Sequence, residues 1–220
     1  MSDVKFALTD KQVFATLFVA IALGGCHDLP RGNLAIRGDS TAIATRGGFS
    51  RVYALAPRLD SDRWWVRLAC AKKPCLKTFN DGVGGQNIAS MRNKMEKDIE
   101  HQGWPTIIYD RLNDEEIPDL YIIDLERAVS EIKTDRFLIM PQIPRAGNGD
   151  NQEYLERAAR VDAEVSRRWP ENTLSAAEKV ALKQKLSSSD TRTDGLHRNA
   201  RGQAIEAEMV EHWTSARGWW

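Results

Sequence analysis

Short apolar runs alternate with longer stretches of helical periodicity along most of this 220-residue chain. The segments NLAIR, CLKTFN, PTIIY and DRFLIM have the apolar and β-branched content of buried strands. Between them lie stretches in which apolar residues recur with a period near 3.6. Strands that alternate with helices in this way favour a parallel sheet covered on both faces. The sequence therefore predicts an α/β fold, a three-layer α/β/α sandwich with a central, mostly parallel sheet.

The individual segments differ in clarity. DRFLIM is the clearest buried strand and ends at Pro141, whereas RWWVRLAC and CLKTFN are both β-rich and either could supply the second strand. Helices are expected in six segments: GGFSRVYALAPRL, NIASMRNKMEKDIE, EIPDLYIIDLERAVSEIK, NQEYLERAARVDAEVSRRW, SAAEKVALKQKL and ARGQAIEAEMVEHW. The expected inner face of the fourth of these consists of Leu155, Ala158, Ala159, Val161, Ala163 and Val165.

Composition excludes some partners. An apolar content of 42% and a charged content of 28% are ordinary for a folded globular chain. Lys plus Arg and Asp plus Glu each total 31, so the formal net charge is zero. A nucleic-acid surface would need a basic excess, and none is present. We therefore expect no nucleic-acid partner.

The N-terminal region departs from this pattern. Residues 13–26, VFATLFVAIALGGC, form a continuous apolar run, shorter than the roughly 20 residues of a membrane span. The run fits the apolar core of a secretory signal, and its end, Leu23-Gly24-Gly25-Cys26, resembles a bacterial lipobox. Asp3 and Asp10 are off-pattern for a signal, so a buried N-terminal helix or an uncleaved anchor stays open.

These features predict an export signal at residues 1–25, lipidation of Cys26, a tether at 26–32 and a single domain at 33–220. The protein would then be a lipoprotein of the bacterial cell envelope, anchored to the membrane on the periplasmic side. In that oxidising compartment Cys70 and Cys75 could close a small disulfide loop, worth about 2 kcal/mol in the chain-entropy model. The alternative is two unpaired thiols.

Four polar blocks follow expected strands or precede the last helix: RGDST, NDGVGGQN, YDRLND and TDGLH. Alone, each has an ordinary structural explanation. Ser40 could cap a helix, and the glycines could make a tight turn. In an α/β sheet, however, ligands bind beyond the carboxyl ends of the strands, where these blocks would lie.

Together and in this order, the four blocks resemble those of the SGNH, or GDSL-type, hydrolase family. The matches are Gly38-Asp39-Ser40, Asn80 to Gly85, Arg111 to Asp114, and Asp194 to His197. They span about residues 33–213, with Arg111 in place of the family's usual glycine. The resemblance implies a flavodoxin-like sandwich and a serine esterase.

The resemblance also implies a role for each matching residue. Ser40 would be the nucleophile, His197 its base and Asp194 the acid that orients the imidazole. The oxyanion donors would be the backbone N–H groups of Ser40 and Gly85 and the side-chain amide of Asn113. Asp39, which precedes the nucleophile, would shape the turn behind it.

The chemistry explains these residue types. A serine hydroxyl is a weak nucleophile and needs an adjacent base, and the base needs an orienting carboxylate. The spacing of the fourth block selects His197, which has Asp194 three residues upstream. No Gly-x-Ser-x-Gly elbow or P-loop occurs, and the four histidines lack metal-ligand spacing. We therefore expect neither a metal nor a cofactor.

The leading prediction is a carboxylic ester hydrolase that acts on a small ester or on an acylated glycan or lipid. One alternative is an inactive SGNH-fold binding protein of the cell envelope, for which Arg111 is the best support. Another is an O-acyltransferase or deacetylase acting on a glycan. Trp64, Trp65 and Trp104 could line a sugar or acyl site, although core packing is the commoner role of such residues.

Overall fold

The computed structural model describes residues 33–43, 63–71, 75–112, 116–145, 150–191 and 197–220. All of them lie within one compact unit, Gly32–Trp220. The predicted signal and tether lie outside the described residues, as does the helix expected at residues 47–59. None of the helices in the described segments has the length and apolar content needed to cross a membrane.

The described strands form one parallel sheet in the order β2-β1-β3-β4. The strands are β1 (Asn33–Gly38), β2 (Lys77–Asn80), β3 (Thr106–Tyr109) and β4 (Phe137–Ile139). Every residue of β3 is buried, as is most of β1, which is the pattern of parallel strands covered on both faces. The predicted parallel sheet is confirmed.

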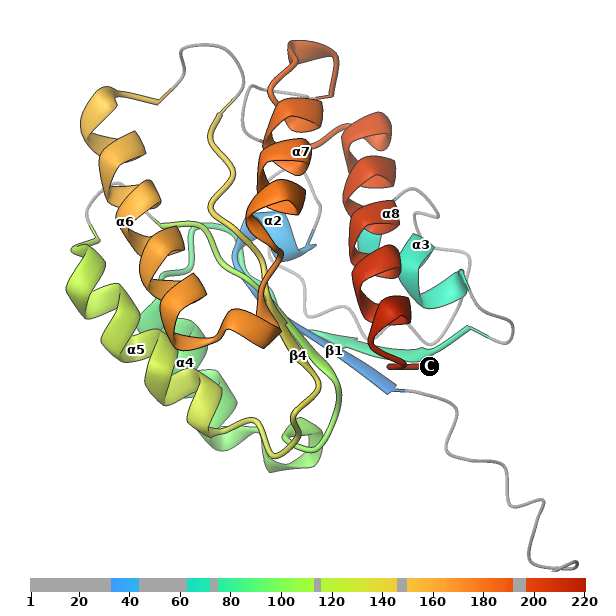
Figure 1. The fold of residues 1–220 in the computed structure, drawn as a ribbon. Helices are drawn as coiled ribbons and strands as arrows, with labels where there is room; N and C mark the ends of the chain where they lie inside the picture. The colour runs from blue at the N-terminus through green and yellow to red at the C-terminus, as the bar shows by residue number, and fades with distance from the viewer. Residues whose placement is uncertain (1–32, 44–62, 72–74, 113–115, 146–149, 192–196) are drawn as a thin grey trace, which may run out of the picture. The chain divides into compact units, whose positions relative to one another are not determined.

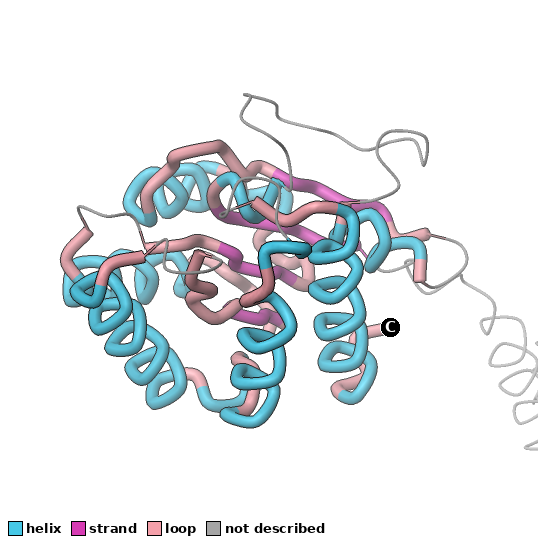
Figure 2. The backbone as a smooth tube through the Cα atoms, turned by 90° about the horizontal axis from the view of Figure 1, so that it is seen from above, coloured by secondary structure: helices cyan, strands magenta, loops and turns pink. Residues whose placement is uncertain are grey.

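Helices pack against both faces of this sheet (Figures 1 and 2). The α-helices are α2 (Ser40–Ile43), α3 (Trp64–Cys70), α4 (Ile88–Lys97), α5 (Pro118–Ser130), α6 (Gln152–Arg168), α7 (Ala176–Leu186) and α8 (Ala200–Ala216). Three short 3₁₀ turns, η1 (Ile99–His101), η2 (Pro170–Asn172) and η3 (Ser189–Thr191), lie in the connections. Helices α4, α5 and α6 contact one another in sequence on one side, and α3, α7 and α8 pack together on the other.

Alternate strand residues build a separate core on each face. Ile107 and Tyr109 of β3 join the cluster under α3, α7 and α8, whereas Ile108 between them joins the cluster under α4, α5 and α6. This period of two is the geometry of an extended strand, whose successive side chains point to opposite faces. The expected three-layer sandwich is therefore confirmed.

The strand order places a switch point between β1 and β3. From β1 the chain moves to β2 on one side, and then crosses back to β3 and β4 on the other. The connections that leave β1 and β3 therefore diverge, which opens a crevice at the carboxyl ends of these two strands. Gly38 and Tyr109, which pair in the β1–β3 register, lie at this end.

The segment RWWVRLAC is a helix, not the strand that its composition indicated. Its buried residues are Trp64, Trp65, Leu68 and Ala69, a spacing that gives one face of a helix. This face packs on α8, and the backbone N–H of Trp64 donates to Gln203 Oε1 over 2.7 Å. Burial of the tryptophans has overridden local β propensity here. The segment CLKTFN supplies β2 instead.

The inner face of α6 is narrower than expected. Tyr154, Ala158, Val161 and Val165 are its buried residues, a stripe with the spacing of single helical turns. Ala158, Val161 and Val165 were predicted correctly, but Ala159 and Ala163 are exposed and Leu155 is half-buried. Alanine is common on both faces of helices, so its position in a sequence defines a face poorly.

Cys70, at the end of α3, and Cys75, just before β2, are joined by a disulfide. The two Cα atoms are 4.2 Å apart, and the loop that they close is short. A bond of this kind ties the end of a helix to the start of the next strand at the edge of the sheet.

A close approach of two backbones requires glycine at the end of β1. A Cβ atom built on Gly38 would lie 1.9 Å from the carbonyl oxygen of Tyr109, and the φ angle of Gly38 is +144°. Other residues rarely adopt this backbone conformation, and here the clash is with backbone that cannot move aside. Any side chain at this position would force β1 and β3 apart.

We expect Gly38→Ala to destabilise the fold by more than about 4 kcal/mol or to abolish soluble expression, because strain and a backbone clash act together. The matched control is Gly103→Ala, since a Cβ there meets nothing within 4 Å and its φ is not in the left-handed region. Urea unfolding of both variants measures the effect. Equal midpoints for the two would contradict the close-approach explanation.

Candidate active site

The structure brings Ser40 and His197 together across 157 residues of sequence. Ser40 is the first residue of α2 and follows β1 at the switch point, and His197 lies just before α8. The Nε2 atom of His197 is 3.0 Å from the Oγ atom of Ser40. Both residues are partly exposed, so a substrate can reach them. This is the distance at which an imidazole can accept the proton of a serine hydroxyl.

The residues that follow His197 are anchored at the start of α8. Asn199 is the N-cap, and its Oδ1 atom accepts hydrogen bonds from the backbone N–H groups of Arg201 and Gly202. The backbone N–H of Asn199 donates to the carbonyl of Thr191 in η3 over 3.1 Å. The helix start and the neighbouring turn therefore hold the histidine segment from its C-terminal side.

The second polar block is fastened to the first by side-chain and backbone bonds. Gln86 Nε2 and the backbone N–H of Val83 donate to the carbonyl of Gly38, over 2.9 and 3.1 Å. Asn80 Nδ2 donates to the carbonyl of Ala42 in α2, over 3.0 Å. The turn after β2 and the nucleophile turn after β1 thus form one hydrogen-bonded unit.

Two glycines of the second block lie at this unit. A Cβ atom on Gly84 would be 3.8 Å from the Cβ atom of Ser40, so the glycine turn runs beside the nucleophile. Gly85, the predicted oxyanion donor, has φ +71°, a conformation that glycine adopts without strain. The glycine turn of the second block therefore lies beside Ser40, and donation by Gly85 stays a prediction.

Two predicted site residues, Asp194 and Asn113, lie outside the described residues. The backbone that leads to Asn113 is nevertheless fixed. Gln142, beyond β4, accepts from the backbone N–H of Leu112 over 2.7 Å and donates to the carbonyl of Asp110 over 3.1 Å. Sequence reasoning missed Gln142, as it did the contact of Gln86, because no local motif marks either residue.

Arg111, which departs from the family pattern, is buried and bonded. Its Nη2 atom donates to Asp150 Oδ1 over 2.6 Å, and its Cζ atom lies 4.3 Å from the ring centre of Tyr154. Asp150 also accepts from the backbone N–H of Arg145. The guanidinium therefore anchors the segment before α6 to the end of β3.

Two carboxyl groups are buried behind the nucleophile turn. Asp39 and Asp110 come directly after the neighbouring strands β1 and β3, and only 5% and 3% of their surfaces are exposed. Neither carboxyl oxygen of Asp110 has a hydrogen-bond partner in the part of the chain that the structure describes. Burial, and then the nearby carboxylates of Asp39 and Glu116, hold the pKa of Asp110 well above its usual range.

A second Asp-x-x-His run, Asp98 to His101, has the spacing that was used to select His197, so that spacing is not unique in the chain. His101 Nδ1 lies 2.7 Å from Asp98 Oδ1, and Arg37 donates to the other oxygen of Asp98 over 2.6 Å. Burial favours the neutral acid, but these bonds outweigh it and hold the pKa of Asp98 below its usual range.

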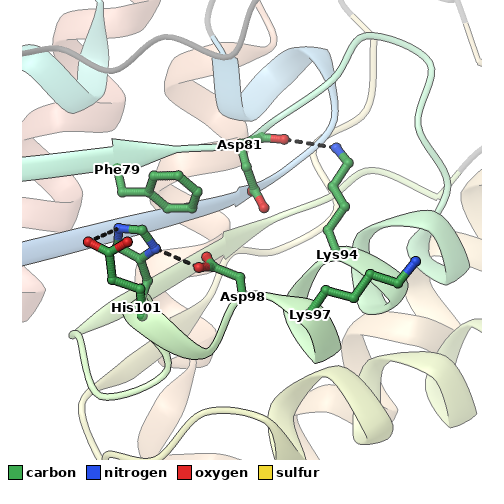
Figure 3. Close-up of a pocket in the computed structure, with 7 residues that line it drawn as sticks. Phe79, Asp81, Lys94, Lys97, Asp98 and His101 are labelled. Carbon is green, nitrogen blue, oxygen red and sulfur yellow. Dashed lines mark hydrogen bonds and ion pairs between the residues drawn. The ribbon is translucent and has the colours of Figure 1, made fainter.

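This second pair lines a cavity of about 260 Å³ beside α4 (Figure 3). Its lining residues are Phe79, Asp81, Lys94, Lys97, Asp98, Glu100 and His101. The ring of His101 is stacked on Phe79 with centroids 3.8 Å apart. No serine, threonine or cysteine is among the described lining residues, so within the described part of the chain this pair has no hydroxyl or thiol beside it. The tertiary structure, and not the spacing, distinguishes it from His197.

The tryptophans considered for a sugar or acyl site are placed differently. Trp64 and Trp65 are 0% and 2% exposed and belong to the core under α8, which is the commoner role of such residues. Trp104 is half-buried and packs edge-on against the ring of His101. Within the described segments, no group of three or more histidine, cysteine or acidic side chains could hold a metal ion.

The raised pKa of Asp110 predicts how stability depends on pH. The unfolded carboxyl loses its proton near pH 3.9, whereas the folded one keeps it to higher pH, so stability falls as pH rises through the window above about 4. Asparagine does not titrate in this window, so the stability of Asp110→Asn lacks this decrease. We expect its free energy of unfolding, relative to wild type, to rise between pH 4 and pH 8.

Urea unfolding of the variant and of wild type at both pH values measures this difference. Glu208→Gln, which changes an exposed carboxylate on α8, is the control and should show no such trend. A constant difference between Asp110→Asn and wild type at the two pH values would show that Asp110 is ionised in the folded protein.

Comparisons with known proteins identify the fold. No family model matches the chain, and a search of curated proteins finds no match. Among solved structures, a lipase/acylhydrolase from Enterococcus faecalis is similar with TM-score 0.63 and 16% identity, over 84% of this chain and 96% of that one. A lipolytic protein of the G-D-S-L family from Veillonella parvula gives 0.58 and 14%, over 82% and 96%.

A catalytic mutant of Axe2, an acetylxylan esterase from Geobacillus stearothermophilus, gives TM-score 0.62 and 18% identity, over 83% of this chain and 93% of that one. These neighbours are covered almost end to end, so the likeness concerns the whole domain and not a shared piece of sheet. The expected fold is confirmed: the chain has the three-layer architecture of G-D-S-L lipolytic proteins and related esterases.

Proposed function

We propose that this protein is a serine esterase that hydrolyses carboxylic ester bonds through an acyl-enzyme on Ser40. The observation that carries the proposal is the 3.0 Å contact between His197 Nε2 and Ser40 Oγ. Two residues from opposite ends of the domain meet at the switch point of a parallel sheet, where α/β proteins bind ligands. The likeness to solved esterase structures supports the same chemistry.

In the first half-reaction, Ser40 Oγ attacks the carbonyl carbon of the ester while His197 Nε2 takes the hydroxyl proton. The carbonyl π electrons move to oxygen and form a tetrahedral oxyanion. When this intermediate collapses, the bond from carbon to the alkoxy oxygen breaks. His197 returns its proton to that oxygen, so the alcohol leaves neutral and the acyl group stays on Ser40.

In the second half-reaction, water replaces the alcohol. His197 takes a proton from the water while the water oxygen attacks the acyl carbon. The bond from that carbon to Ser40 Oγ then breaks, and His197 returns the proton to Ser40 Oγ. The carboxylic acid leaves and the enzyme is regenerated. Each tetrahedral oxyanion needs preorganised donors, and we assign these to the backbone N–H groups of Ser40 and Gly85 and to the amide of Asn113.

Asp194 completes the proposed triad. A carboxylate bonded to the second ring nitrogen would hold the imidazole of His197 in the tautomer whose Nε2 accepts a proton. The roles of Asp194 and Asn113 rest on their motif positions, and the anchoring of the segments around Leu112 and Asn199 supports them.

Acetylated sugars are the substrate class we favour among small esters. One solved neighbour is an acetylxylan esterase, and both catalytic side chains here are partly exposed. Arg111, the sequence support for an inactive binding protein, bonds Asp150 and lies over the ring of Tyr154, so its side chain has a structural role. Acyl transfer to a glycan hydroxyl would use the same acyl-enzyme with a different acceptor.

We also propose that the protein acts in the cell envelope, with lipidated Cys26 as its anchor. The support is the apolar run and lipobox-like end of residues 13–26. The test compares membrane association and esterase activity of Cys26→Ala with wild type in bacteria. Loss of the anchor with retained activity is the expected result, and a variant that stays in the membrane would favour an uncleaved helix.

The test of the chemistry is hydrolysis of p-nitrophenyl acetate and octanoate by residues 33–220, beside Ser40→Ala and His197→Gln. Loss of nucleophile or base costs about 10⁶ in kcat in a well-studied serine protease, and we expect a loss of at least about 10³ here. Favoured acetate over octanoate would support a deacetylase. A fluorophosphonate probe should label wild type and not Ser40→Ala.

His212→Ala is the matched control, because His212 is an exposed histidine on α8. It should keep full activity. Rates for Ser40→Ala equal to those of folded wild type would remove the esterase proposal, since ester cleavage would then not depend on the proposed nucleophile.

A further inference from the structure

The residue directly after His197 belongs to a closed network of buried polar groups. Arg198 Nε donates to Glu206 Oε1 over 2.5 Å, and its Nη2 atom donates to the hydroxyl of Tyr109 over 2.8 Å. That hydroxyl in turn donates to the same Glu206 oxygen over 2.5 Å. The side chains of Arg198 and Glu206 are 2% and 1% exposed, so water does not weaken these bonds.

The network connects three parts of the molecule that carry the site. Tyr109 ends β3 and pairs in register with Gly38, which precedes the nucleophile by two residues. Glu206 is on α8, and Arg198 lies between His197 and the N-cap of that helix. The Tyr109 ring is itself held, because it meets the Trp64 ring edge-on at 5.9 Å. Arg198, which follows the proposed base His197, is thus bonded directly to β3, the strand that pairs with the end of β1 next to Ser40.

Stability alone does not account for a buried ion pair at this position. Replacing such a pair with apolar residues of similar volume is often neutral or stabilising, so a well-packed core does not need one. A directional network does what apolar packing cannot, because it fixes one backbone position in three dimensions. Here that position is one residue from the imidazole that must meet Ser40 Oγ.

We propose that Arg198 is a positioning residue that, through Tyr109 and Glu206, holds His197 in bonding range of Ser40. This proposal rests on the esterase function proposed above, and it adds that fast reaction requires the bonds of Arg198. A shift of about 1 Å in a reacting group can cost a factor of 10² in rate. Loosening the network should therefore slow the chemical step while leaving the substrate site intact.

The mildest test is Tyr109→Phe, which keeps the ring and removes only the shared hydroxyl. The second variant, Arg198→Met with Glu206→Leu, removes both buried charges together, so neither is left unpaired. We expect the rate constant for fluorophosphonate labelling of Ser40, per folded molecule, to fall about tenfold or more in both. In ester hydrolysis, kcat should fall with KM little changed.

Arg167→Met is the matched control, because Arg167 is an exposed arginine on α6 that pairs with Glu164 and belongs to no contact of the His197 segment described above. Its labelling rate should equal that of wild type. Thermal unfolding of every variant separates loss of fold from loss of positioning. A double variant that unfolds at the same temperature as wild type but labels slowly would support positioning, because the slower reaction could not then be due to lost stability.

Nitrogen NMR of the His197 ring gives a readout that does not need activity. Shifted or broadened ring signals in Tyr109→Phe are the expected result. If wild type failed to label but these signals still moved, the esterase function would fall and the positioning would stand. Unchanged labelling and unchanged ring signals in both variants would overturn the proposal, and so would full labelling by the double variant.

Discussion

The contact between the ends of β1 and β3 fixes the described part of the candidate site. Gly38 and Tyr109 are register partners, and their backbones approach so closely that no side chain fits at Gly38. The carbonyl of Gly38 accepts the two bonds that hold the glycine turn beside Ser40. The hydroxyl of Tyr109 accepts from Arg198, the neighbour of His197. Ser40 and His197, the proposed nucleophile and base, are therefore both located relative to one pair of residues.

Buried charge concentrates around this end of the sheet. Arg37, near the end of β1, donates to Asp81 and Asp98, and on the other face Arg198 pairs with Glu206. Such groups lose hydration when the chain folds, and their mutual attraction roughly offsets that loss. They add little to stability, whereas fixed dipoles and charges are what an active site uses to hold reacting groups in place. The positioning role proposed above for Arg198 would explain why one such pair lies beside His197.

Much of this arrangement could be predicted from the sequence. β-rich runs and intervening periodic stretches indicate a parallel sheet, and polar blocks after β1, β2 and β3 then have to gather at one edge. The meeting of Ser40 with His197 followed from motif order. Long-range partners could not be predicted, because Gln86 reaches Gly38 over 48 residues and Arg198 reaches Tyr109 over 89, distances at which spacing carries no signal.

Arg111 shows why a departure from a family motif has to be judged by where the side chain goes. In the sequence, Arg111 in place of the family's usual glycine is the best support for the inactive alternative. In the structure its Nη2 atom donates to Asp150 and its Cζ atom lies over the ring of Tyr154, both residues near the start of α6. The adjacent backbone is held independently, by Gln142. The bonds from Gln142 position the backbone on either side of Arg111 without using its side chain. The bond from Arg111 to Asp150 is therefore an additional anchor, between the end of β3 and the segment before α6.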